Sequence, residues 1–341
     1  MARAYSGREW SAIVGIANND AGSSVGAVGA ATQDANHVSL SKVLMRADTT
    51  NMFDYSASYQ RAEVSRAGVR VLRAEDIINH YGSGTWTWDF DWLVDNEKGI
   101  QNLLELMYPN HGGTITTSMT YPAAPTVNDL SHGETAESVS KLAFIILQNP
   151  LATRDHYMHS ANLQELTLSM SATADGGRLR ASGQFMSGYK PIIENNSIGA
   201  DTGDADYAKG LFDCTTSTFG GDAAIVRDFS LTISNPASRV GWQGTGGETD
   251  GYSRGGAFSI TGSITMKSDS LQQINDDTFW KANTTAALVL GEGTSLDFNL
   301  PAVNVSNISL DMAEEGIFQT VDFTATSGAD AGGNLAVIKA T

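Results

Sequence analysis

Residues 166 to 188 carry the pattern that most limits what this chain can fold into, two alternating segments around an Asp-Gly turn. In the first segment Leu166, Leu168 and Met170 alternate with hydroxyl-bearing residues. The turn sequence Asp175-Gly176-Gly177 follows, and alternation resumes in "LRASGQF". Period-two alternation around such a turn is typical of a β-hairpin with one buried face. The pattern therefore predicts a hairpin whose other face carries short polar side chains.

The chain repeats this pattern about sixty residues later, in "FSLTISN" and "AFSITGSITMKS". Aligned without gaps, Leu163, Leu166, Leu168, Met170 and Ser171 match Val226, Phe229, Leu231, Ile233 and Ser234, and Leu179, Ala181, Gly183 and Phe185 match Phe258, Ile260, Gly262 and Ile264. A third alternating set follows in "SLDFNLP", "NISLDMA" and "GIFQTVDFTATSG". Facing antiparallel hairpins are the natural halves of a sandwich or barrel. We expect a mainly β fold with some α structure, an antiparallel β sandwich or barrel flanked by an α-helix.

Two segments have helical patterns. Residues 96 to 108 place apolar side chains at helical spacing and stop at Pro109. Residues 134 to 148 follow a capping-box pattern formed by Ser131 and Glu134, and they carry a broad apolar stripe that ends at Asn149-Pro150. We expect helices near 96–108 and 134–148, the second of them covering one face of the sheet.

A row of aromatic residues marks the segment from Thr85 to Val94, "TWTWDFDWLV". Trp86, Trp88, Phe90 and Trp92 alternate with Thr and Asp residues, as in a strand with one apolar face. The segment is interpreted as a core or subunit-contact strand, and the alternative is a sugar-binding aromatic platform.

Composition excludes several classes of protein. The formal net charge of −17 argues against a protein that holds nucleic acid by neutralising phosphates. Such a charge fits either an ordinary acidic surface or a surface that repels a polyanion. Cys214 is the only cysteine, which rules out an intramolecular disulfide framework and suits a reducing cytoplasm. No stretch has the length of apolar residues that a membrane span needs, and the first residues lack a signal-peptide pattern, so we expect no membrane anchor.

The predicted organisation is an N-terminal arm followed by one β domain. Residues 1–50 are rich in Ala, Gly, Ser and Asn, which is typical of an extension with little core of its own. Residues 51–341 are expected to form the β domain, with a candidate outer elaboration within residues 50 to 130.

The C-terminal half resembles the major tail tube proteins of tailed bacteriophages. The resemblance lies in the order and pattern of "VRDFSLTISN", "GGAFSITGSITMKS", "DDTFWKANTTAALVLGEG" and "SLDFNLPAVNVSNISLDMAEEGIFQTVDFTATSG", with the hairpin at 163–188 fitting the same plan. It covers residues 160–341 well and the N-terminal half loosely. It implies a structural virion protein, assembled in the bacterial host cytoplasm, in which six subunits form a ring and rings stack into a tube that conducts DNA.

The resemblance also implies roles for particular segments and partners. The inner strands of the six subunits join into one barrel, so the polar hairpin faces are candidates to line the channel: Glu165, Thr167, Ser169, Asp228, Ser230, Thr232, Ser259, Thr261 and Ser263. Hydroxyls and carboxylates offer no cation to trap a phosphate, so DNA passes without sequence-specific binding. Residues 1–50, 190–222 and 236–256 are candidate contacts between rings. Expected partners are further copies of this chain and the tape measure, tail terminator and baseplate or tip proteins.

Other features leave alternatives open. From alternation alone, the polar faces also fit an ordinary sandwich with a solvated outer side, and Arg178, Arg180 and Lys267 fall on the same faces. Those cations pair with neighbouring carboxylates, or the faces are subunit contacts. The alternative function is a β-sandwich carbohydrate-binding or adhesin-like module that uses Trp86, Trp88 and Trp92.

No pattern supports an enzyme or a cofactor site. The G-x-S-x-G match at residues 22 to 26 lacks the strand and helix that a nucleophile elbow needs. His156 and His159 lack further ligands at metal-binding spacing, and Asp201, Asp204 and Asp206 lack the Gly and Glu of an EF-hand loop. The sequence therefore predicts no catalytic, cofactor-binding or metal-binding residues.

Overall fold

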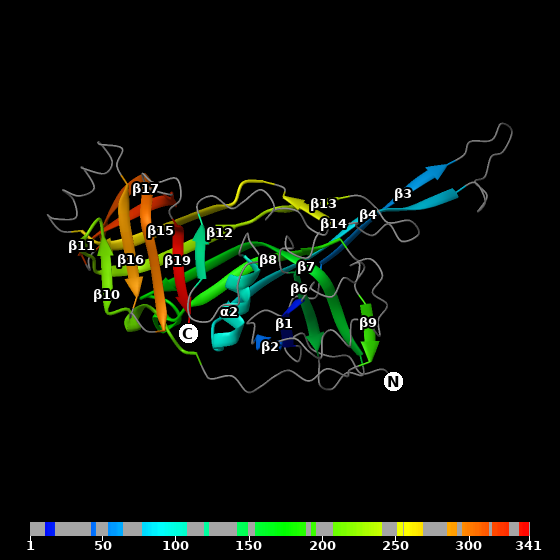
Figure 1. Cartoon of the computed structure of the whole chain (residues 1–341), viewed down its shortest axis with the longest axis horizontal. Coiled ribbons are helices and arrows are strands. Elements are labelled where there is room, and N and C mark those ends of the chain that lie inside the picture. The colour runs from blue at the N-terminus through cyan, green and yellow to red at the C-terminus, as the bar shows by residue number, and fades with distance from the viewer. Residues whose placement is uncertain are drawn as a thin grey trace.

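The structure is a computed structural model of the chain. It describes residues 11–17, 42–45, 54–63, 77–107, 119–122, 142–148, 154–188, 192–195, 207–240, 251–254, 256–268, 285–291, 295–313, 316–326 and 334–340. Within these residues the chain is mostly antiparallel β structure with little helix (Figure 1), which confirms the mainly β fold expected from the sequence.

One long strand, β7 (Arg154–Ser171), belongs to two sheets. Its first half pairs with β6 (Leu142–Gln148) and β9 (Ile192–Asn195), and β6 continues to β1 (Ser11–Ala17) and β2 (Lys42–Met45). Its second half pairs with β8 (Arg180–Ser187) on one side and β12 (Val226–Ser234) on the other. Strand β7 thus connects a small sheet to a larger one.

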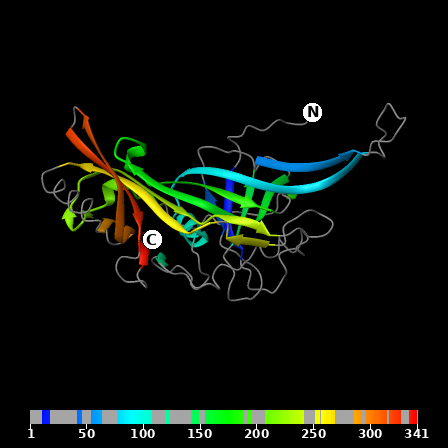
Figure 2. The same ribbon diagram turned by 90° about the horizontal axis from the view of Figure 1, so that it is seen from above.

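The larger sheet runs β3–β4–β8–β7–β12–β15–β18–β17, and its strands are antiparallel throughout. The strands that complete it are β3 (Asp54–Glu63), β4 (Ile77–Leu93), β15 (Ser259–Lys267), β18 (Gly316–Ala325) and β17 (Leu296–Ala313). Figure 2 shows the long strands crossing the molecule, with the β3–β4 hairpin at one end and the β17–β18 hairpin at the other. Both predicted hairpins, β7–β8 and β12–β15, are confirmed.

The first half of β17 leads into a second layer. It pairs with β16 (Ala286–Gly291) on one side and β19 (Asn334–Ala340) on the other. Beyond these lie β10 (Thr216–Phe219), β11 (Asp222–Ala223) and β5 (Met119–Pro122), and a separate hairpin joins β13 (Ala237–Val240) to β14 (Gly251–Arg254). The rings of Phe229 in β12 and Phe298 in β17 lie 5.0 Å apart between centroids, so the two layers share one core.

The aromatic row of β4 is part of this core. Trp88 and Trp92 are at most 1% exposed, and Phe90 is buried with them. The Trp88 ring stacks on Phe185 of β8 at 5.8 Å. The core interpretation of this row is confirmed, and these three rings present no open surface to a sugar.

Helix α2 (Glu97–Leu106) confirms the helix expected near 96–108. The side chain of Asn96 caps it by accepting a hydrogen bond from the Gly99 backbone N–H at 3.0 Å. Its apolar face is buried, with Ile100, Leu103 and Leu104 in the core. Gln101 donates to the backbone carbonyl of Ala340, which ties the helix to β19.

The prediction of a second helix at residues 134 to 148 is wrong for residues 142–148, the part that the structure describes. Residues 142–148 form β6, which lies between β1 and β7, and all its side chains from Leu142 to Leu147 are buried. A short run that is apolar on every face fits a strand buried on both sides as well as it fits a helix. Residues 134–141 lie outside the described residues.

Parts of the predicted N-terminal arm and of the candidate outer elaboration are described. Within residues 1–50, strands β1 and β2 belong to the small sheet, and Ile13 and Val14 are buried, so these segments are not an extended arm. Within residues 50 to 130, β4 enters the main sheet beside β8 and α2 packs on the core. These described parts therefore belong to the main fold. Their contacts with other rings remain predictions.

Candidate channel-lining face

The nine predicted channel-lining residues lie on three neighbouring strands, β7, β12 and β15. Cross-strand register places them in rows: Glu165–Ser234–Ser259, Thr167–Thr232–Thr261 and Ser169–Ser230–Ser263, with Asp228 one step further along. Residues directly opposite one another in antiparallel strands point to the same side of the sheet. The structure thus gathers all nine on one face, which we call the polar face.

The polar face is wider than the sequence analysis predicted. The row through Thr167 continues to Ser182 and Asp91 on one side and to Thr324 and Asn304 on the other. It therefore crosses seven strands, β4–β8–β7–β12–β15–β18–β17. The added polar-face residues are Asp89, Asp91, Ser182, Gln184, Thr265, Asn304, Asn307, Ser309, Thr320, Asp322 and Thr324. Their alternation was visible in the sequence, but the pairing between segments far apart was not.

Hydrogen bonds run along the polar face between neighbouring strands. The hydroxyls of Thr167 and Thr232 lie 2.9 Å apart, and so do those of Thr265 and Thr320. Ser171 donates to the Asp228 carboxylate. These bonds link the short hydroxyl side chains of neighbouring strands along the polar face.

Both arginines that the sequence placed on this face have partners within the chain. Arg180 donates to both oxygens of Asp91, at 2.6 and 3.0 Å, and to Asp175 at 3.0 Å. Arg178 donates to the backbone carbonyl of Val94. Lys267 is exposed at the end of β15. Ion pairing within the face is thus confirmed for Arg180, and it occupies a guanidinium that would otherwise attract phosphate.

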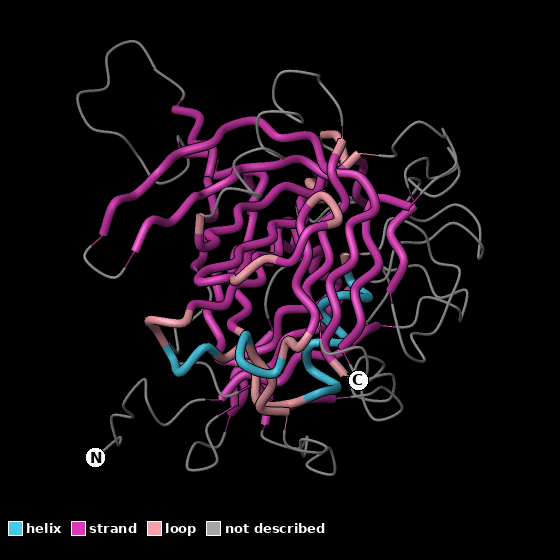
Figure 3. Tube along the Cα trace, turned by 90° about the vertical axis from the view of Figure 1, so that its left-hand side faces the viewer, coloured by secondary structure: helices cyan, strands magenta, loops and turns pink. Residues whose placement is uncertain are grey.

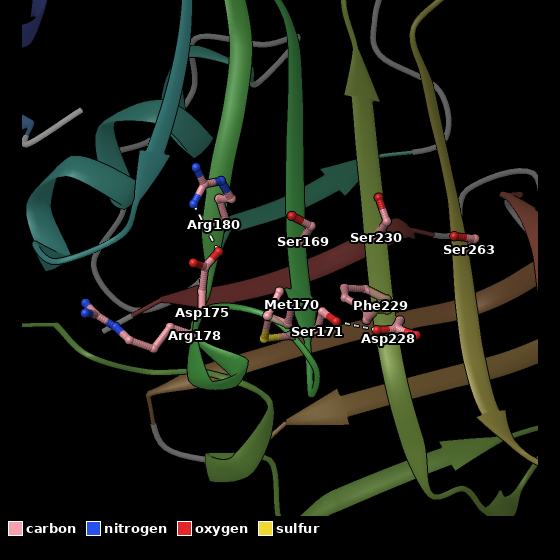
Figure 4. A pocket seen from close by; sticks show the side chains of 11 residues that line it. Ser169, Met170, Ser171, Asp175, Arg178, Arg180, Asp228, Phe229, Ser230 and Ser263 are labelled. Carbon is pink, nitrogen blue, oxygen red and sulfur yellow. Dashed lines mark hydrogen bonds and ion pairs between the residues drawn. The ribbon is translucent and has the colours of Figure 1, made fainter. Parts of the chain in front are cut away.

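A shallow cavity of about 260 Å³ opens on the polar face near the β7–β8 turn (Figure 4). Ser169, Ser230 and Ser263 stand side by side along it, and Asp175 lies beside Arg180 at its rim. It is smaller than most sites for drug-sized ligands. It is a hollow in the polar face.

The opposite side of these strands packs into the core through two equivalent glycines. Gly183 in β8 lies against the Phe90 ring, and a Cβ there would be 2.2 Å from the Glu165 carbonyl oxygen. Gly262 in β15 lies against Phe323, where a Cβ would be 2.4 Å from the Ser230 carbonyl oxygen. The repeated glycine of the two hairpins thus has the same structural role in both.

The remaining sequence candidates do not form a site among the described residues. Within that part of the chain, no three His, Cys, Asp or Glu side chains are placed to hold a metal ion. His156 lies in β7, where burial lowers the pKa of its imidazole. The G-x-S-x-G match at 22 to 26, and Asp201, Asp204 and Asp206, lie outside the described residues. Among the helices that are described, none is long and apolar enough to cross a membrane.

The loops expected between rings are partly described. Within 190–222, Tyr207 is buried and donates to the Ser295 carbonyl, so this part packs on its own subunit. Within 236–256, β13 and β14 form a hairpin. No known family model and no curated protein matches this chain.

Proposed function

We propose that this protein is a structural subunit of a bacteriophage tail tube and that its polar face lines the channel through which DNA passes. The observation that carries the proposal is the polar row across seven strands, from Asp91 to Asn304. A face this wide and regular exceeds what a small binding site needs, and it suits a wall along which a polymer slides.

The charge of the polar face favours sliding over binding. It carries the carboxylates of Asp89, Asp91, Glu165, Asp228 and Asp322. Of the cations near it, Arg180 is held between two carboxylates, Arg227 pairs with Asp228, and Lys267 is exposed at the end of β15. DNA binding depends on cations that neutralise phosphates, so an acidic face with an occupied guanidinium repels the backbone. The strand order of the sheet also supports assembly. Strand β3 forms one edge of the large sheet, and the second half of β17 forms the other. At these edges the inner strands of neighbouring subunits would join.

The proposal extends to location and partners. A tail tube subunit is a virion protein that is assembled in the cytoplasm of the bacterial host, in hexameric rings that stack. Its other contacts would be the tape measure protein inside the tube and the terminator and baseplate or tip proteins at the ends. The carbohydrate-binding alternative has less support, since the Trp88 and Trp92 rings on which it depends are buried.

Negative-stain electron microscopy of the purified protein over a range of concentrations tests assembly. Hollow rings, or tubes with a regular axial repeat, are the expected result. Monomers that never associate, even in concentrated samples, would contradict the proposal.

A charge variant tests which face lines the channel. Ser230→Lys places an ammonium group in the centre of the polar face, and Asn299→Lys places one on the exposed side of the second layer. We expect rings of the Ser230→Lys variant alone to retain DNA in a gel-shift assay at low salt, and to release it as salt rises. Equal retention by both variants would show that the polar face does not line the channel.

A further inference from the structure

All five large apolar side chains that are exposed in the described part of the chain belong to one end of the large sheet: Phe212, Ile225, Leu310, Met312 and Ile317. We call this set the apolar end. Met312 is 79% exposed and Ile225 68%. Monomeric proteins rarely gather exposed apolar side chains in one region without a partner.

Strand pairing and backbone hydrogen bonds link four of the five residues. Met312 and Ile317 face each other across the β17–β18 hairpin, and Leu310 lies two residues along the same side. The Ile225 carbonyl accepts from the Lys267 N–H and the Ile317 carbonyl from the Ser268 N–H, so the starts of β12 and β18 flank the end of β15.

Phe212 completes the apolar end through the turn after β7. Its ring lies so close to Gly177 that a Cβ there would be 2.5 Å from it, and Ala172 in the same turn donates to the Arg227 carbonyl at the start of β12. The apolar end therefore follows the ends of β7, β12, β15, β18 and β17, a width of about 20 Å at normal strand spacing. Figure 3 views the molecule from this side, and Figure 2 shows the β17–β18 hairpin at the left.

Two cations, Arg227 and Lys267, stand among the residues of the apolar end. Arg227 pairs with Asp228 at 2.8 Å, reaches Asp311 at 3.9 Å and lies over the Phe318 ring at 4.3 Å. Lys267, exposed beside them, adds a second positive charge against these two carboxylates. On a chain of net charge −17, the exposed ammonium group of Lys267 can meet an acidic surface of a second copy.

We infer that the apolar end is the surface by which one copy of this chain docks on another along the tube axis. The inference rests on the proposed function and deepens it, since it assigns the contact between rings to this sheet end. The polar rows run across the strands, so neighbours within a ring meet at the sheet edges and neighbours along the axis meet at the strand ends. One apolar end docked on a different surface of the next copy is a heterologous contact that does not close, and it produces a filament.

Glutamate substitutions at the apolar end test this inference. Met312→Glu and Ile225→Glu change exposed side chains, so we expect both variants to fold with the wild-type circular dichroism spectrum and melting temperature. Asn299→Glu is the matched control, because it adds the same charge at an exposed site in the second layer. Electron microscopy and sedimentation velocity would then be compared across concentrations.

We expect wild-type protein and the control to form tubes, and the two apolar-end variants to form single rings or to need at least about tenfold more protein for stacking. Hydroxyl-radical footprinting should show Met312 protected in wild-type tubes. Unchanged tubes from both variants would overturn the inference and leave the tail-tube proposal standing. Wild-type rings that never stack would also overturn the inference and leave the tail-tube proposal standing. Wild-type protein that stays monomeric at every concentration would overturn both the inference and the tail-tube proposal.

Discussion

At the residue scale, Gly183 and Gly262 are the most demanding positions of the repeated hairpins. Each lies against an aromatic ring of the neighbouring layer and against a backbone carbonyl oxygen. We expect Gly262→Ala to lower the free energy of unfolding by about 1–3 kcal/mol, because the added methyl must displace backbone. Urea unfolding followed by tryptophan fluorescence measures the change.

Ser263→Ala is the matched control for that substitution, since it alters the next residue on the opposite, polar face. Its cost should remain below about 0.5 kcal/mol. If Gly262→Ala lowered the free energy of unfolding as little as the control does, β15 would not lie as close to Phe323 as the structure shows.

His156 gives the fold a dependence on pH. Burial lowers the pKa of its imidazole from 6.5, so the folded state resists the proton that the unfolded state accepts. The neutral form stabilises the fold above the unfolded pKa, and this contribution is lost as pH falls through 6.5 towards the lower folded pKa.

We therefore expect stability to fall as the pH is lowered from neutral to below 6.5, and His156→Gln to remove part of that fall. Denaturant titrations of both proteins over this range measure it. Parallel profiles for the two proteins would show that other groups cause the acid sensitivity.

At the scale of elements, the hydroxyl rows contribute little to stability and much to the chemical character of the polar face. Thr167 and Thr232 share one hydrogen bond between β7 and β12. A double-mutant cycle with Thr167→Val and Thr232→Val should give a coupling energy of about 0.5–1 kcal/mol. A coupling near zero would indicate that solvent replaces the bond at no cost.

Local sequence pattern predicted the hairpins well because alternation and turn residues act over a few positions. The β7–β8 turn contains Asp175 and Gly176, both with positive φ, as the Asp-Gly signal predicts. Local pattern could not predict which residues of β7 and β12 lie opposite one another on the polar face. That register depends on the packing of residues more than fifty positions apart.

The error at residues 134 to 148 has a different cause. A capping-box pattern and an apolar run are both compatible with a helix, and the sequence holds no mark of the two strands that enclose β6. Tertiary pairing with β1 and β7 decided the outcome, as it commonly does for short runs that are apolar on all sides. The same pairing explains why β1 is a buried strand in a region whose composition predicted an arm.

At the scale of the whole molecule, two properties oppose each other. The net charge of −17 repels copies of the chain, whereas the apolar end and the open sheet edges favour association. Assembly therefore depends on how far solvent screens the charge. This balance suits a subunit that must remain dispersed after synthesis and polymerise at a growing end.

Ionic strength should shift this balance in a predictable direction. The screening length falls from about 30 Å at 0.01 M salt to about 8 Å at 0.15 M, so repulsion between acidic copies weakens while apolar contacts persist. We expect the protein concentration at which rings and tubes appear to fall over this range, as measured by sedimentation velocity and light scattering. Met312→Glu should keep the salt dependence of ring formation but lose that of stacking, because it alters the apolar end alone. A concentration that rises with salt would instead mean that ion pairs between copies, rather than apolar burial, hold the assembly together.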